Sequence, residues 1–139
     1  MKAPINLDQH NIIDYAFVAT GLTAPAALNF PAEAVKSIAA VSMLSFSKDL
    51  NTRYRYSLRK KIPIGVHMVG DLVVGGAIAA APFALGYAKK MKPWQLALQV
   101  AFGLSAFAVV GMTHPRSEAG REREKEIPGE LEHVRSLAA

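Results

Sequence analysis

The sequence predicts an all-α fold: an integral membrane four-helix bundle built from two tandem helical hairpins, followed by a short cytoplasmic C-terminal helical tail. Three observations support this prediction. Charged residues almost vanish from four stretches of the chain and crowd between them. Three of these stretches reach the roughly 20 residues that a helix needs to cross a bilayer core. Seven positions of a 21-residue segment that opens the first hairpin also recur, without a gap, at the start of the second.

The four apolar stretches are expected to form the helices. The second stretch is short, and it spans a membrane only if the helix extends over residues 31–49 and Lys36 reaches the interface. A soluble four-helix core is the alternative. It is disfavoured because the fourth stretch has little beyond Gln95, Gln99 and Ser105 to face water. In chain order the stretches are residues 11–30, 34–46, 64–87 and 93–112.

The charge pattern also predicts the domain boundaries. A short N-terminal segment precedes the helices, a basic loop joins the two hairpins, and a charged tail follows them. In the tail, Leu131, Val134 and Leu137 form a short amphipathic stretch that suits a membrane surface or a partner. The segments are residues 1–10, 11–113 (repeat 1 about 10–47, basic loop 48–63, repeat 2 about 64–113) and 114–139.

Lysine and arginine indicate the orientation. With four spans, both termini lie on the same side as the basic loop, and that side collects most of the positive charge. The opposite side has Lys89, Lys90 and Lys92, with Lys36 beside them. The positive-inside rule therefore places both termini in the cytoplasm. The basic loop is expected to contact anionic lipid and not nucleic acid, because its role in topology already accounts for its charge.

An internal repeat is the most informative feature of the chain. The string His10-x3-Asp14 returns as His67-x3-Asp71, 57 positions later. The same offset aligns the two Ala-Pro pairs and the Leu-x-Phe and Leu-x-Tyr motifs that follow them. Each copy opens a helical hairpin, so both copies enter the membrane in the same direction. A pseudo-two-fold axis along the membrane normal is expected to relate them.

These motifs carry a resemblance. The repeat, with Thr52-Arg-Tyr54 between its copies, resembles a group of small bacterial four-helix membrane proteins that are similar to the SPW-repeat family. In that family each helix pair ends in Ser-Pro-Trp, whereas this chain has Ala-Pro-Ala at 24–26 and Ala-Pro-Phe at 81–83. The resemblance covers residues 5 to about 114. It implies the two-hairpin plan and a bacterial inner membrane, cytoplasmic or intracytoplasmic. It adds nothing about mechanism, because the family has no established biochemical activity.

The two His-x3-Asp pairs are the candidate chemical site. At this spacing His10 neighbours Asp14, and His67 neighbours Asp71, on one face of each helix. A carboxylate near lipid is costly, so the four side chains should meet inside the protein at its cytoplasmic end. Three interpretations stay open. The pairs form structural hydrogen bonds that complement the helix dipoles, they hold a metal ion or relay protons, or the histidines hold a haem.

Small residues and prolines indicate how the helices pack. Small residues spaced four apart let helix backbones approach closely. Pro25 and Pro82 are expected to kink or end the first and third helices near their exits. The alternative for these prolines is an unwound segment beside a transport site. The small residues expected at helix contacts are Gly75, Gly76, Ala79, Ala80, Ala97 and Ala101.

The function expected from the sequence is non-catalytic. The chain has no nucleotide-binding glycine loop, no G-x-S-x-G, no H-E-x-x-H and no cysteine. We therefore expect an accessory or stabilising subunit of a larger membrane complex, acting through helix packing with other membrane subunits and without a predicted cofactor. The alternatives are a small oligomeric transporter coupled to ions or protons through the His–Asp pairs, and a redox protein that binds haem or metal.

Overall fold

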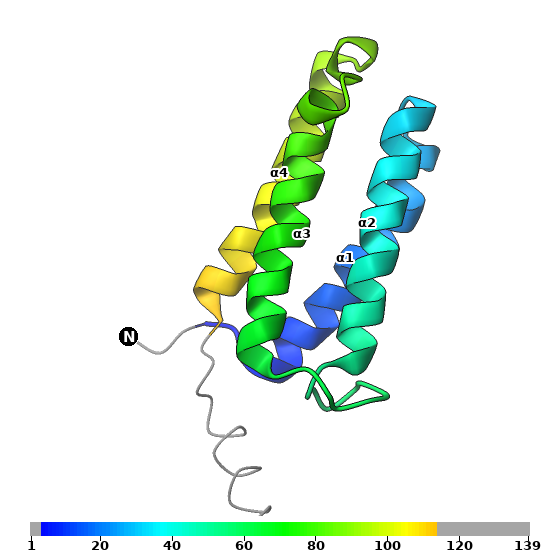
Figure 1. Cartoon of the computed structure of the whole chain (residues 1–139). Coiled ribbons are helices and arrows are strands. Elements are labelled where there is room, and N and C mark those ends of the chain that lie inside the picture. Colours follow the sequence, from blue (N-terminus) through cyan, green and yellow to red (C-terminus); the bar gives the residue numbers. More distant parts are fainter. Residues whose placement is uncertain (1–3, 114–139) are drawn as a thin grey trace, which may run out of the picture.

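The computed structural model describes residues 4–113, and the regular elements in this part of the chain are all helices. In Figure 1, α1 and α2 form one pair and α3 and α4 form another, and the two pairs stand side by side. The all-α prediction is therefore confirmed, while the expected tail lies outside the described residues. The elements are α1 (Leu7–Ala27), α2 (Ala32–Asn51), α3 (Ile64–Ala84), the 3-10 turn η1 (Ala88–Lys90) and α4 (Pro93–Met112).

Two helices are longer than the apolar stretches that predicted them. The α1 helix begins at Leu7 because Asn6 caps it. The Asn6 side chain accepts a hydrogen bond from the backbone N–H of Gln9, whose own side chain accepts one from the backbone N–H of Asn6. The α2 helix continues to Asn51, so the short second stretch belongs to a helix of 20 residues. A search for apolar runs does not detect the two polar ends of this helix.

The two hairpin turns share one construction. Asn29 and Gly86 adopt left-handed backbone conformations, with φ of 53° and 74°. These two residue types enter that region at low cost. The residue before each of them donates its backbone N–H to the carbonyl four residues back, at 2.9 Å. Pro25 and Pro82 therefore lie inside the last turn, and each helix ends two residues after its proline.

Backbone hydrogen bonds join the two repeats at the end of the bundle where α1 and α3 begin, here called the inner end. The backbone N–H of Ile5 donates to the carbonyl of Met112 at 3.2 Å, and that of Ile62 donates to Asn51 at 2.8 Å. The start of each repeat thus pairs with the end of the other. Such reciprocal pairing is the pattern that a two-fold axis produces, and it agrees with the expected pseudo-symmetry.

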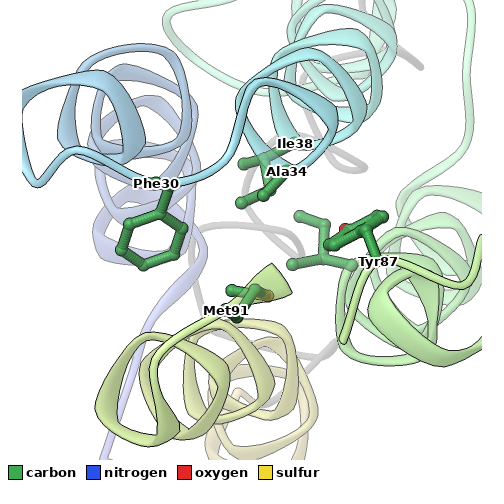
Figure 2. Close-up of a cluster of buried hydrophobic side chains, with 6 residues drawn as sticks. Phe30, Ala34, Ile38, Tyr87 and Met91 are labelled. Carbon is green, nitrogen blue, oxygen red and sulfur yellow. The ribbon is translucent and has the colours of Figure 1, made fainter. Parts of the chain in front are cut away.

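A hydrophobic cluster fills the bundle towards the opposite, outer end. Figure 2 shows Phe30, Ile38, Tyr87 and Met91 converging from the two helix pairs. The Tyr87 hydroxyl does not stay unpaired in this apolar setting, because it bonds to Gln99 Nε2 at 2.7 Å. The buried members of the cluster are Phe30, Ala34, Ile38, Ile78, Tyr87 and Met91.

Polarity is reversed relative to an ordinary water-soluble bundle, since polar side chains are buried and large apolar ones are exposed. Val73 on α3 and Leu104 and Phe107 on α4 each expose more than two fifths of their surface. Within residues 4–113, α3 and α4 are long and apolar enough to cross a membrane, and α1 and α2 are less apolar. The buried polar residues are His10, Asn11, Asp14, Ser42, Ser45, Asp49, Thr52, His67, Asp71, Gln95, Gln99 and Thr113.

Glycine allows α3 and α4 to approach each other. A Cβ atom placed on Gly75 would lie 2.5 Å from the carbonyl oxygen of Gly103 and 2.7 Å from Cβ of Ala106. A Cβ on Gly103 would lie 2.6 Å from the backbone nitrogen of Ala79. Gly75 and Ala79 are therefore contact residues, as the sequence indicated, and Gly103 is a contact residue that sequence analysis missed among larger neighbours.

The other small residues expected at contacts lie elsewhere. Gly76 is half-buried, and a Cβ added to it would be 3.9 Å from the nearest neighbour, the ring of Phe107. Ala80, Ala97 and Ala101 are exposed. Within the described residues they therefore lie on the outside of the α3–α4 pair.

The glycine contact yields a stability prediction. Gly75→Ala should lower the free energy of unfolding by about 1–3 kcal/mol, because the new methyl group overlaps the α4 backbone. Gly76→Ala is the matched control one position along, and it should be neutral or slightly stabilising. Denaturation of the detergent-solubilised protein, followed by circular dichroism, measures both. Equal stabilities of the two variants would contradict this packing.

Candidate functional site

The His-x3-Asp pairs of both repeats meet at the inner end of the bundle. His10 and His67 are completely buried, while Asp14 and Asp71 expose 8% and 6% of their surface. One ligand atom from each of the four residues lies within 4.8 Å of the other three. This cluster, here called the His–Asp centre, could therefore hold a metal ion.

The carboxylate closest to His10 lies across the pseudo-two-fold. Its Nε2 is 3.2 Å from Oδ2 of Asp71 and 3.5 Å from Oδ1 of Asp14, the neighbour on its own helix. His67 Nε2 is 3.0 Å from Oδ2 of Asp14 and 3.1 Å from Oδ2 of Asp71. The Nε2 atom of each imidazole thus faces both carboxylates. The sequence predicted only the contacts within each helix.

Two threonine hydroxyls form hydrogen bonds with the Nδ1 atoms of the two histidines. His10 Nδ1 is 2.7 Å from the Thr113 hydroxyl, and His67 Nδ1 is 2.8 Å from the Thr52 hydroxyl. Each hydroxyl also donates to the backbone carbonyl four residues earlier, at 2.7 Å for Thr113 and 2.8 Å for Thr52. A hydroxyl has one hydrogen, so it accepts a hydrogen bond from Nδ1–H of the histidine. Both imidazoles therefore carry a proton on Nδ1 and turn Nε2 towards the carboxylates.

Sequence analysis did not assign the threonines to the site, although a signal was present. Thr52 and Thr113 are the C-terminal caps of α2 and α4. They are 61 positions apart, whereas the histidines are 57 apart. The turn between α3 and α4 is longer than the turn between α1 and α2, and this shifts the second helices of the repeats out of the common offset. An alignment that allowed this insertion would have paired the threonines.

One feature of the His–Asp centre breaks the symmetry. Lys48 Nζ pairs with Oδ1 of Asp71 and lies 2.7 Å from Oδ1 of Asp49. It is also 3.1 and 3.2 Å from the two ring nitrogens of His67. An atom that is almost equally close to both nitrogens lies over the face of the ring, so it leaves the in-plane lone pair of Nε2 free. The equivalent positions on α4 are valines.

Tyr54 covers the His–Asp centre on its inner side. The centre of its ring is 4.7 Å from that of His67 and 6.0 Å from that of His10. Burial and the negative charges of three nearby carboxylates raise the pKa of the Tyr54 phenol far above its usual range. The phenol therefore stays neutral. Its hydroxyl has no hydrogen-bond partner within the described residues.

A small cavity adjoins the His–Asp centre. It measures about 20 Å³ and is lined by His10, Asp14 and Asp71 together with Ser45 and apolar side chains of α1, α3 and α4. This volume suits a single water molecule. A haem macrocycle needs far more room than this between the two imidazoles, so the geometry gives the haem interpretation no support.

The structure also bears on the transport alternative. That alternative was based on the His–Asp pairs and on helices that the prolines would unwind beside a substrate site. Within the described residues α1 and α3 continue as helices through Pro25 and Pro82 to their ends at the outer turns. The prolines belong to the hairpin turns and lie at the end of the bundle opposite the His–Asp centre.

No protein-family model, curated protein or solved structure matches the chain. The resemblance to the SPW-repeat family therefore stays a prediction. What can be said about the site is based on the geometry of the centre itself.

The threonine caps make a testable contribution. Thr52→Val and Thr113→Val should each lower the free energy of unfolding by about 1–3 kcal/mol, because the N–H of a buried imidazole loses its acceptor. Thr23→Val is the matched control, since Thr23 makes the same bond to the carbonyl four residues back, at 2.8 Å, on the exposed face of α1. Chemical denaturation in detergent measures all three. A loss in Thr23→Val as large as in the other two would contradict the assigned role.

Proposed function

We propose that this chain is a non-catalytic, multi-pass membrane protein whose four helices all cross the membrane as two tandem hairpins. The distribution of polarity carries this proposal. The exposed residues of α1 between Ile12 and Leu28 are apolar or threonine. Asp14, which lowers the hydropathy of this helix, is buried against His67. A helix of this kind is unfavourable in water and suits lipid, because lipid meets only its apolar face.

The same reasoning applies to α2. Its charged residues Lys48 and Asp49 lie at the inner end and pair with each other inside the bundle. Its remaining charges, Glu33 and Lys36, are exposed within the first turns at the outer end. Between these ends the exposed residues include Met43 and Leu44. The helix therefore offers an apolar band between two polar ends.

We place the inner end in the cytoplasm of a bacterial inner membrane. The loop between α2 and α3 carries exposed basic residues without an acidic one among them. The outer end has four lysines and one acidic residue, Glu33, which pairs with Lys90. The positive-inside rule favours this orientation, and the loop is suited to anionic lipid headgroups. The exposed basic residues of the loop are Arg53, Arg55, Arg59, Lys60 and Lys61.

Within the membrane we propose an accessory or stabilising role in a larger assembly. The His–Asp centre is buried, and a cavity of about 20 Å³ admits nothing larger than water or an ion. This supports a role in packing more than one in converting an organic substrate. The small residues Ala80, Ala97 and Ala101 are exposed on α3 and α4, where they would let a helix of another subunit approach closely.

Cysteine labelling tests the orientation directly, because the chain contains no cysteine. Leu58→Cys introduces a thiol in the basic loop, at a position that is 80% exposed. Lys89→Cys introduces one at the exposed outer turn. In intact cells a membrane-impermeant maleimide should label the Lys89→Cys variant and should reach Leu58→Cys only after the membrane is opened. Labelling of both thiols from one side would contradict four spans.

Particle mass tests the accessory role. Extraction from the native membrane in mild detergent should give a particle much larger than the 14.9 kDa chain, with other subunits in it. Ala101→Phe should release the chain from this particle without lowering its own thermal stability, because the new side chain fills only the outer face. Ala40→Phe, at an exposed position of α2, is the matched control. A free chain or a small homo-oligomer in the wild type would contradict the role.

A further inference from the structure

We propose that His10, Asp14, His67 and Asp71 bind one first-row divalent metal ion of the Zn²⁺ type. This goes beyond the packing role, and it does not depend on the partner of the chain.

The proton positions leave the Nε2 lone pairs facing carboxylate oxygens, and this arrangement requires a cation between them. The threonine hydroxyls place the histidine protons on Nδ1, so the Nε2 atoms of His10 and His67 present lone pairs. The atoms opposite them are carboxylate oxygens, at 3.2 and 3.0 Å for the shortest pairs. Acceptors that face acceptors at this distance repel each other. A proton on each Nε2, or a single metal ion between all four groups, removes the repulsion.

The shape of the His–Asp centre favours the metal ion. A proton on Nε2 points to one acceptor, but each Nε2 lies close to oxygens of both carboxylates. The four N···O separations are 3.0, 3.1, 3.2 and 3.5 Å. In a tetrahedral site with metal–ligand bonds of about 2.0–2.1 Å, adjacent ligand atoms lie about 3.3 Å apart. Three of the four separations involve one oxygen from each carboxylate and lie near this edge length, whereas the 3.5 Å contact uses the other oxygen of Asp14. The four candidate ligand atoms lie within 4.8 Å of one another, so a bound ion would draw the widest pair closer together.

Charge balance gives an independent argument. With neutral imidazoles, the three carboxylates of Asp14, Asp49 and Asp71 and the ammonium of Lys48 leave two net negative charges in a buried place. One divalent cation balances them. Lys48 holds Oδ1 of Asp71 and leaves Oδ2 for the metal, so it acts as a positioning residue. The two threonines do the same for the histidines.

The ligand types select the class of metal. Two imidazole nitrogens and two carboxylate oxygens suit borderline first-row dications, whereas Mg²⁺ and Ca²⁺ prefer larger sets made of oxygen alone. Each helix pair supplies one histidine and one aspartate. A metal ion at this position would therefore join the two hairpins, and the adjoining cavity of about 20 Å³ has room for one additional water ligand.

Metal titration of the full-length chain in detergent tests the proposal. After treatment with a chelator, the wild type should bind one Zn²⁺ per chain, and a large excess of Mg²⁺ should not compete. Asp14→Asn and Asp71→Asn should each weaken binding more than tenfold, since second-shell changes alone cost roughly 10–100-fold. Glu33→Gln is the control, because this carboxylate lies at the opposite, outer end of the bundle and pairs with Lys90. It should retain the site with a much smaller loss.

Two further measurements keep the test decisive if an asparagine variant fails to fold. X-ray absorption on the zinc-loaded wild type should show four nitrogen or oxygen neighbours at about 2.0 Å. Thr52→Val and Thr113→Val keep all four ligands and should weaken Zn²⁺ binding roughly 10–100-fold. The proposal is overturned if the folded wild type does not bind Zn²⁺, or if folded asparagine variants bind it undiminished. Binding that disappears in His114→Gln or His133→Gln alone would place the metal in the tail and would overturn it equally.

Discussion

The crosswise pairing of His10 with Asp71 and of His67 with Asp14 is the interaction on which the inner end of the structure depends. Each pair joins one repeat to the other, so the two hairpins are linked at the position where their first helices begin. The pairing is possible only because a carboxylate and an imidazole occur one helical turn apart in both repeats. The Ile5 and Ile62 backbone hydrogen bonds repeat the same reciprocal linkage next to the centre.

The polar interior explains how the helices are suited to lipid. The polar side chains near the inner ends of α1 and α2, among them Asp14 and Asp49, face inward, and between the polar ends of these helices the exposed surface is mainly apolar. At the outer end, the same principle acts through Gln99, which serves both the hydroxyl of Tyr87 and the carbonyl of Ile78. The inside of the bundle is therefore held in part by hydrogen bonds and close glycine contacts, which are the interactions that the proposed membrane location requires.

The departure from symmetry gives the His–Asp centre its electrostatic character. A strictly symmetric version would have two histidines, two aspartates and two threonines. The addition of Lys48 and Asp49 in one half brings an ammonium over the face of His67 and fixes one oxygen of Asp71. Because Lys48 supplies one positive charge against three carboxylates, the His–Asp centre keeps two net negative charges when its imidazoles are neutral.

The sequence by itself determined the helical class, the repeat, and the identity of the four residues in the centre, because apolar runs and the i, i+4 spacing are local patterns. It also marked Gly75 and Ala79 as contact residues, but not that Ala97 and Ala101 face outward, since spacing does not say which face a neighbour covers. Only the tertiary structure decided the crosswise partners, the threonine caps and the position of Lys48. These depend on how four helices meet in space, and an insertion in one hairpin turn was enough to hide the equivalence of the threonines from the repeat.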